Sequence, residues 1–474
     1  MSTLINHDGT PEHDHSHGSL PTHEDHTLFN VAQEGESGRK GFHPTKFLSI
    51  TWRSSCNASK YVNVLWPFVL IAIILHFAAP GLHMWVFAMS YIGMIPAANL
   101  VGFAGQELAR KMPKVAGILI ETALGSIVEI VLFLVLIARS KSGNSEEGSS
   151  EEGNLVPVIQ AAILGSILTN LLLCLGMCFF VGGLRQQTQT FHAVVSEVGS
   201  GLLLVAGFGL LIPSAFYSAL KSSTVSVKIG SLVIQAHRFT EEKLLSSTQA
   251  ISRATSVILI IAFFIYIFYN AQSQHSIFDE ILEADEHKDA DRQADLAKAK
   301  FTYTECIVAL IISLTIVTML ADFLVERIDD VVEGGIPDQF LGLILLPLVE
   351  KLAEHLTAVD EAWDSTMNLA LFHCIGPSIQ TALFNGPLVV LVGWALGKPM
   401  DLNFEIFMVA LLVLSILVVG NFLRDKESNY LEGALLVIIY VIIAIAAWYY
   451  PNPDVATSNG VEDFAMGVKQ LQVQ

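Results

Sequence analysis

The sequence predicts an all-α polytopic membrane protein with about eleven transmembrane helices, in which two inverted five-helix repeats follow a first extra helix. Hydrophobic residues make up 52% of the 474-residue chain and charged residues only 15%, whereas a typical soluble domain is about 25% charged. Apolar runs long enough to cross a bilayer recur along the chain. In addition, the sequence contains two pairs of similar segments, and the two members of each pair are separated by an odd number of predicted spans. Such a separation gives the two members opposite orientations in the membrane.

The apolar runs define the spans to within a few residues. They are residues 62–79, 84–105, 115–138, 156–182, 193–217, 254–271, 304–324, 338–361, 369–396, 404–423 and 433–450. The resulting organisation is a disordered His-rich cytoplasmic tail (1–60), the first helix with the first repeat (61–271), an acidic cytoplasmic linker (272–303), the second repeat (304–450) and a C-terminal tail (451–474).

The tail and the linker are polar segments. Six tail histidines alternate with acidic residues: His7, His13, His15, His17, His23 and His26. Such a tract binds Zn²⁺ or another divalent ion weakly, or is only a solvated tail, because it has no fixed ligand spacing. We expect deletion of residues 1–40 to leave basal transport intact. The acidic linker either attracts cations or is simply solvated.

Basic residues orient the chain in the membrane. They precede the first span between Arg39 and Lys60 and follow the second at Arg110, Lys111 and Lys114. Because cytoplasmic loops carry an excess of Lys and Arg, we expect a cytoplasmic N-terminus. The basic loop after span five disagrees, but it is some thirty residues long and is a weak exception.

Two pairs of segments form an internal repeat. GILIETALGSIVE (117–129) resembles GLILLPLVEKLAE (342–354), and GSILTN (165–170) resembles GPSIQT (376–381). Five spans separate the members of each pair, so the two copies enter the membrane from opposite sides. This is the inverted-repeat plan of secondary transporters, which bind substrate at mid-membrane between the halves.

Carboxylates inside apolar spans are the strongest functional signal. Glu129 ends the first copy, and Glu354 ends the second with His355 beside it. A charged group at a helix centre costs about 2.5–3.5 kcal/mol, which function or pairing must offset. Carboxylate oxygens suit Ca²⁺, Na⁺ or K⁺, and a desolvated carboxylate holds either a cation or a proton. The structural alternative is two carboxylates hydrogen-bonded between helices.

Neutral oxygens surround these positions. They belong to Ser126, Ser166, Asn170, Ser378 and Gln380. Each alone is a weak signal, because Ser and Asn commonly join membrane helices.

These segments resemble the Ca²⁺/H⁺ exchanger (CAX) family over roughly residues 60–450. The resemblance is carried by LGSILTNLLLCLGMCFFVGGLRQQTQTF from Leu164, LGLILLPLVEKLAEHLTAV from Leu341, GPSIQTALFNGPLVVLVGW from Gly376 and MDLNFEIF from Met400. It implies eleven spans, an acidic linker, an organellar and often vacuolar membrane, and cation uptake driven by protons. The family signature is Gly-Asn-x-x-Glu in each half. Glu129 and Glu354 match its glutamates, and His355 matches the histidine that follows the second.

The chain departs from that signature. Ser126 replaces the first Asn, Glu350 and Lys351 replace the second Gly-Asn, and Glu121 stands where the family usually has a neutral residue. A fixed positive charge at Lys351 disfavours Ca²⁺. Either Glu350 or Glu354 neutralises this charge, or the lysine side chain snorkels away from the site. The second motif resembles that of fungal monovalent cation/proton antiporters in this family.

The first functional prediction is therefore Ca²⁺/H⁺ exchange, with a Na⁺ or K⁺/proton antiporter and a non-transporting degenerate paralogue as alternatives. Glu129 and Glu354 are the predicted metal ligands. The predicted cation- and proton-binding set is Glu129, Glu354, Ser126, His355, Lys351, Glu350, Glu121, Gln380, Ser378, Asn170 and Ser166.

Other classes of protein fit the sequence poorly. There is no P-loop pattern, so we expect neither an ATP-driven pump nor an enzyme, and no cofactor. The net charge of −19 argues against nucleic acid as a partner, which leaves the cation, protons and the bilayer. The five cysteines have no spacing typical of a disulfide framework or a zinc site.

Overall fold

The structure is a computed structural model. It describes residues 38–112, 114–140, 155–221, 224–229, 232–237, 241–272 and 298–450. The tail histidines, most of the acidic linker and the C-terminal tail lie outside the described residues.

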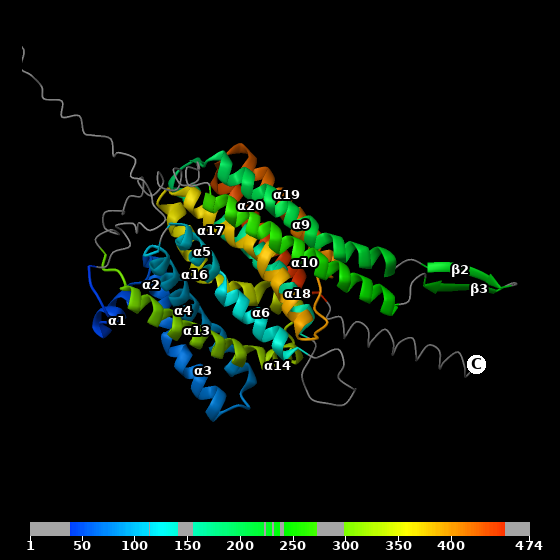
Figure 1. Cartoon of the computed structure of the whole chain (residues 1–474), viewed down its shortest axis with the longest axis horizontal. Helices are drawn as coiled ribbons and strands as arrows, with labels where there is room; N and C mark the ends of the chain where they lie inside the picture. Colours follow the sequence, from blue (N-terminus) through cyan, green and yellow to red (C-terminus); the bar gives the residue numbers. More distant parts are fainter. Residues whose placement is uncertain are drawn as a thin grey trace, which may run out of the picture.

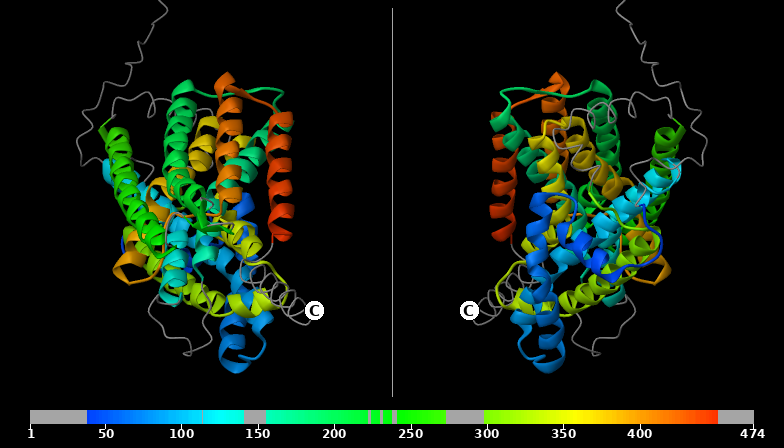
Figure 2. Two further views of the ribbon diagram at one scale, coloured as in Figure 1. Left: turned by 90° about the vertical axis from the view of Figure 1, so that its right-hand side faces the viewer. Right: turned by 90° about the vertical axis from the view of Figure 1, so that its left-hand side faces the viewer.

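The described chain is a bundle of helices, which Figures 1 and 2 show from three directions. In the first half these are α3 (Trp66–Ala78), α4 (His83–Ala109), α5 (Lys114–Gly125), α6 (Ile127–Arg139), α7 (Val156–Leu168), α8 (Leu175–Arg185), α9 (Ala193–Lys221) and α10 (Glu241–Gln272). In the second half they are α13 (Tyr303–Val325), α14 (Ile328–Glu333), α15 (Asp338–Phe340), α16 (Leu346–Trp363), α17 (Met367–Gln380), α18 (Gly386–Ala395), α19 (Ile406–Phe422) and α20 (Tyr430–Trp448).

The predicted helical membrane fold is confirmed. Nine helices of the described ranges are long and apolar enough to cross a membrane. The two other predicted spans, 115–138 and 338–361, are also helical but do not meet that criterion. The first is divided into α5 and α6 at Ser126, and the second carries the charges of Glu350, Lys351 and Glu354. The count of eleven spans therefore stays a prediction.

Some segments differ from the expected pattern. Two helices, α1 (Pro44–Arg53) and α2 (Asn57–Val62), lie in the range expected to be a disordered tail. The loop after span five contains the antiparallel pair β2 (Thr224–Ile229) and β3 (Leu232–His237). A second short pair joins β1 (Gln189–Thr190) to β4 (Glu427–Ser428). Figure 1 shows the β2–β3 hairpin projecting from the ends of α9 and α10.

A π-helical segment interrupts the helix that follows Glu129. A second one interrupts the helix that follows Glu354. In the first half η3 (Thr169–Cys174) joins α7 to α8, and in the second half η5 (Thr381–Asn385) joins α17 to α18. A third π segment, η4 (Leu341–Leu345), leads into α16. Isolated π turns occur frequently at functional sites, and η3 and η5 begin at or beside the last residue of each copy of the second repeat segment.

The two halves pack crosswise at the centre of the bundle. The helix α7 contacts η4 and η5, and α17 contacts η3. Gly165 makes the first of these contacts possible, because a Cβ there would meet the backbone carbonyl of Leu343. On the other side of the molecule α4 packs along both α3 and α13, as Figure 1 shows.

Candidate functional site

Three charged side chains meet where the halves contact each other. The Lys351 ammonium group lies 3.3 Å from Glu129 Oε2 and 3.5 Å from Glu354 Oε2. The side chains of Glu129 and Lys351 are 0% and 1% exposed, whereas that of Glu354 is 28% exposed. The sequence-predicted glutamates are therefore joined through the lysine. Lys351 points into the site and does not snorkel away from it.

Glu129 is held mainly by the opposite half. The Thr381 hydroxyl lies 2.8 Å from Oε1 and 3.0 Å from Oε2, and Asn385 Nδ2 donates to Oε2 at 3.1 Å. Since the Thr381 proton goes to the carboxylate, Ser166 donates to the Thr381 oxygen, 3.4 Å away. The break at Ser126 puts Glu129 in the first turn of α6, where the helix dipole favours a negative charge.

Among the described residues, the residue after Glu354, rather than Glu354 itself, contacts the first half. This residue, His355, is buried, with Nε2 2.9 Å from Asn170 Oδ1 on η3. On the same helix Glu350 is 3% exposed, and its two carboxyl oxygens have no hydrogen-bond partner among the described residues. Each repeat thus supplies a carboxylate region that contacts the π segment of the other repeat.

Four predicted residues lie outside this cluster or at its margin. Ser378 donates to the backbone oxygen of Cys374 on its own helix, 2.9 Å away. Gln380 and Ser126 are buried, and the Ser126 hydroxyl has no partner among the described residues. Glu121, on α5, lies near His373, which pairs with Glu361 at 2.7 Å.

The residues predicted from the sequence do not include Thr381, Asn385 or the His373–Glu361 pair. Thr381 ends the repeated segment GPSIQT, so the repeat itself carried a signal for it. Asn385 follows one turn later, in FNGP, and had no such signal.

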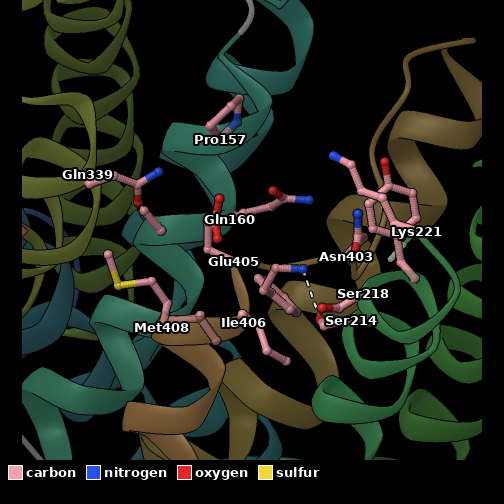
Figure 3. A pocket seen from close by; sticks show the side chains of 14 residues that line it. Pro157, Gln160, Ser214, Ser218, Lys221, Gln339, Asn403, Glu405, Ile406 and Met408 are labelled. Carbon is pink, nitrogen blue, oxygen red and sulfur yellow. Dashed lines mark hydrogen bonds between the residues drawn. The ribbon is translucent and has the colours of Figure 1, made fainter. Parts of the chain in front are cut away.

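A separate pocket lies at the start of α7, nearer to that end of the helix than the charged cluster is (Figure 3). It is lined by side chains from α7, α9 and the loop before α19, including Gln160, Ser214 and Lys221. Ser214 accepts a hydrogen bond from the backbone of Phe404 at 3.0 Å. Leu164 also lines this pocket, two residues before Ser166, so along α7 the pocket extends toward the charged cluster.

The cluster can hold a positive charge between carboxylates from two halves of the chain. Threonine and asparagine add neutral oxygens, and Asn385 Oδ1 has no hydrogen-bond partner among the described residues. A set of hard oxygen donors suits Ca²⁺ or an alkali cation and not a soft metal.

The chain is similar to known proteins over most of its length. The model of a family described as "Sodium/calcium exchanger protein" matches residues 82–272 and 306–449. The chain is 33% identical over 402 residues to "Vacuolar cation/proton exchanger 5" of Arabidopsis thaliana, covering 83% of this chain and 82% of that protein. It is 30% identical over 399 residues to the "Vacuolar calcium ion transporter" of Schizosaccharomyces pombe, covering 83% and 86%.

Solved structures share the fold. The structure of native YfkE has a TM-score of 0.60 and 24% identity, covering 82% of this chain and 98% of that one. A structure described as the H⁺/Ca²⁺ exchanger CAX has a TM-score of 0.57 and 11% identity, covering 88% and 95%.

Proposed function

This chain belongs to the sodium/calcium exchanger protein family, and from that premise we propose that it exchanges Ca²⁺ for protons across the vacuolar membrane. Relatives named as vacuolar cation/proton exchangers and vacuolar calcium ion transporters support the ion, the coupling and the membrane. The nine apolar helices of the described residues support an integral membrane location.

The position of the Lys351 ammonium group is the observation that carries this proposal. A positive charge lies within 3.5 Å of one carboxylate from each half, in a site closed to solvent around Glu129. Taking an ion out of water costs several kcal/mol, which only close opposite charges recover. The site is therefore built around a cation, and Lys351 occupies the position of the transported ion.

Exchange follows from competition for the same carboxylates. When Ca²⁺ replaces the ammonium group, Glu129 and Glu354 balance its two charges. When protons replace Ca²⁺, the carboxylates become neutral acids. Both arrangements keep the net charge of the interior low, as a low dielectric requires. Lys351 withdraws when Ca²⁺ binds, which its flexible four-carbon stem permits.

Access to the site is proposed from the side on which α16 ends. Glu354 is the exposed member of the cluster, and Glu361 and His373 lie further along the same side. Toward the opposite side, α7 packs against η4 through Gly165 and Gly342. With a cytoplasmic N-terminus and eleven spans, the α16 end faces the cytoplasm and the pocket of Figure 3 faces the vacuole.

A monovalent cation is the second candidate substrate. As long as Lys351 remains charged beside the carboxylates, it offsets one negative charge and favours Na⁺ or K⁺ over Ca²⁺.

The test is ion flux into proteoliposomes under an imposed pH gradient, with Ca²⁺, Na⁺ and K⁺ compared in parallel. We expect Ca²⁺ uptake that collapses when the gradient is dissipated. Glu129→Gln should abolish it, because a neutral amide cannot balance a cation there. The matched control is Glu427→Gln, which changes an exposed glutamate on β4. If the folded protein moves none of the three ions, it is not a transporter. If the Glu129→Gln variant retains full flux, the site is wrong.

A further inference from the structure

Three of the five cysteines meet inside the bundle, although they are far apart in the sequence. Cys174 ends η3, Cys178 lies on α8 and Cys374 lies on α17. All three side chains are 0% exposed, and none forms a disulfide. Cys374 Sγ lies 3.4 Å from Cys174 Sγ and 3.8 Å from Cys178 Sγ, and all three sulfurs lie within 4.8 Å of one another.

The spacing of the sulfurs fits a metal ion at their centre. With metal–sulfur bonds of about 2.3 Å, the sulfurs of a zinc–thiolate site lie roughly 3.8–4.0 Å apart. The two separations from Cys374 Sγ, 3.4 and 3.8 Å, differ from this by at most a few tenths of an ångström, and the third lies within 4.8 Å, so small rotations of the side chains can supply the rest. The cluster therefore needs no rearrangement of helices to bind an ion.

The donor set selects a soft or borderline ion. Thiolates bind Cd²⁺ or Zn²⁺ and discriminate against Ca²⁺, which requires oxygen ligands. A divalent ion that displaces two thiol protons and keeps the third sulfur as a neutral donor leaves the cluster uncharged. The two protons are released to water. A neutral complex is the form that a buried, low-dielectric position tolerates.

The cysteine cluster shares structural elements with the proposed exchange site. Asn170, which contacts His355, shares η3 with Cys174. Cys374 is on the helix that continues into η5, whose Thr381 holds Glu129. The helix α16, which carries Glu354, packs against both η3 and α8, which carry Cys174 and Cys178.

We propose that Cys174, Cys178 and Cys374 form a second metal site, which takes Cd²⁺ or Zn²⁺ and inhibits exchange. The bound ion joins η3 and α8 of the first half to α17 of the second. It thereby fixes η3, which contacts His355, relative to α17, which continues into η5 and its contacts with Glu129. The chain would then carry an oxygen site for its substrate and a sulfur site for an inhibitor.

The binding test uses the full-length protein and Cd²⁺ alone. We expect one tightly bound Cd²⁺ per chain and a thiolate-to-cadmium charge-transfer absorption in the ultraviolet. Cys374→Ala and Cys178→Ala should each weaken binding at least about tenfold and remove the absorption. Cys306→Ala is the matched control, because Cys306 is equally buried but lies on α13, outside the cluster. Size-exclusion chromatography checks the fold of each variant.

The inhibition test measures Ca²⁺ flux in proteoliposomes at increasing Cd²⁺. Inhibition should require at least about tenfold more Cd²⁺ in Cys374→Ala than in the parent or in Cys306→Ala. The Glu129→Gln variant should still show the Cd²⁺ absorption, which separates the sulfur site from the proposed exchange. A Cd²⁺ absorption that survives Cys374→Ala and Cys178→Ala overturns the site. Equal inhibition of parent and cluster variants overturns its effect on exchange.

Discussion

At the scale of residues, the site is a set of charges that depend on one another. Lys351 pairs with Glu129 and Glu354, and all three charges lie in or beside the buried centre. Removing one partner of a buried ion pair typically costs about 3–5 kcal/mol, because the remaining charge is left uncompensated. Removing Lys351 should destabilise Glu129 by less than this, because Thr381 and Asn385 also donate hydrogen bonds to its carboxylate.

The positive charge of Lys351 lowers the net negative charge of the site that binds the transported ion. We expect Lys351→Asn to raise Ca²⁺ flux relative to Na⁺ and K⁺ flux, because the repulsion removed is twice as large for a divalent ion. Paired fluxes of the three ions under one pH gradient measure this ratio. Lys426→Asn is a suitable control, because Lys426 is exposed and has a left-handed backbone conformation that Asn tolerates. An unchanged ratio would show that Lys351 does not act on selectivity.

The Thr381 hydroxyl orients Glu129. Thr381→Val keeps the side-chain shape but removes the donor to the carboxylate, so we expect at least about a tenfold loss of exchange, corresponding to one hydrogen bond to a charged group. Ser378→Ala removes a hydroxyl one turn earlier that bonds only to its own helix. Flux in proteoliposomes compares the two. If both variants lose flux equally, the hydroxyl has no specific role in the site.

The glutamates could be predicted from the sequence and most of their partners could not. Glu129 and Glu354 stand out because a charge in an apolar span is costly. Thr381 has no charge to mark it, because threonine is common in membrane helices, and its only signal is its place at the end of the repeated segment GPSIQT. It meets Glu129 across 252 residues of chain, and only the packing of the halves determines that contact.

At the scale of elements, interruptions of regular helix build the site. Apolar length predicted the spans, but it did not predict the break at Ser126 or the π segments η3, η4 and η5. The residues on both sides of such an interruption are equally hydrophobic. A hydrophobicity pattern therefore does not indicate where a helix is interrupted. The break at Ser126 puts Glu129 in the first turn of α6, and η3 and η5 carry Asn170 and Thr381, each of which contacts a residue of the other half.

The contact between α7 and η4 depends on Gly165. Adding a methyl group by Gly165→Ala places it against the Leu343 carbonyl, which is backbone and cannot rotate away. We expect a loss of about 1–3 kcal/mol of stability or a shift of the two helices. Gly201→Ala on α9 adds the same methyl group where no atom lies within 4 Å. Thermal unfolding in detergent distinguishes them. Equal melting temperatures would mean that the α7–η4 contact is not tight.

The loop before α19 contains a buried carboxyl group with a shifted pKa. Burial raises the pKa of Asp401, despite hydrogen bonds from the Asn403 backbone and the Gln160 side chain. A raised pKa means that the folded state holds the proton more tightly than the unfolded state. Stability therefore falls as the pH rises from the ordinary aspartate pKa of about 3.9 through the raised value.

Asp401→Asn should remove this pH-dependent loss. We expect the variant to have a higher melting temperature than the parent at neutral pH and a smaller advantage in mildly acidic buffer. Thermal unfolding at several pH values measures both. A stability gain that does not change with pH would exclude the titration of Asp401 as its cause.

At the scale of the whole molecule, the N-terminal segment from Arg39 to Arg53 forms hydrogen bonds and an ion pair with the start of the second half. Arg39 pairs with the buried Glu305 at 3.0 Å and donates to the Lys300 backbone oxygen at 2.8 Å. Arg53 donates to the Ala299 backbone oxygen. The segment expected to be a tail thus contacts the start of α13, where the second half begins.

These contacts define how much of the N-terminus can be removed. We expect deletion of residues 1–37 to leave the melting temperature and the flux unchanged. Deletion of residues 1–43 should lower stability by about 1–3 kcal/mol, because Glu305 loses the hydrogen bonds from Arg39 and from the His43 backbone. Deletion of residues 1–40 would remove Arg39 and its contacts, and the expectation that it leaves basal transport intact stays a prediction. Identical melting curves for the two deletions would show that this segment does not stabilise the bundle.

The dependence of Glu129 on the second half has a consequence for biosynthesis. Thr381 is translated 252 residues after Glu129, which at about 5–20 residues per second is a delay of roughly 13–50 s. For most of that interval the nascent chain has neither Lys351, which is translated 30 residues before Thr381, nor Thr381 itself to accompany the carboxylate. Until the second repeat has been made, the apolar residues of α6 must therefore offset the cost of a carboxylate in the membrane, about 2.5–3.5 kcal/mol.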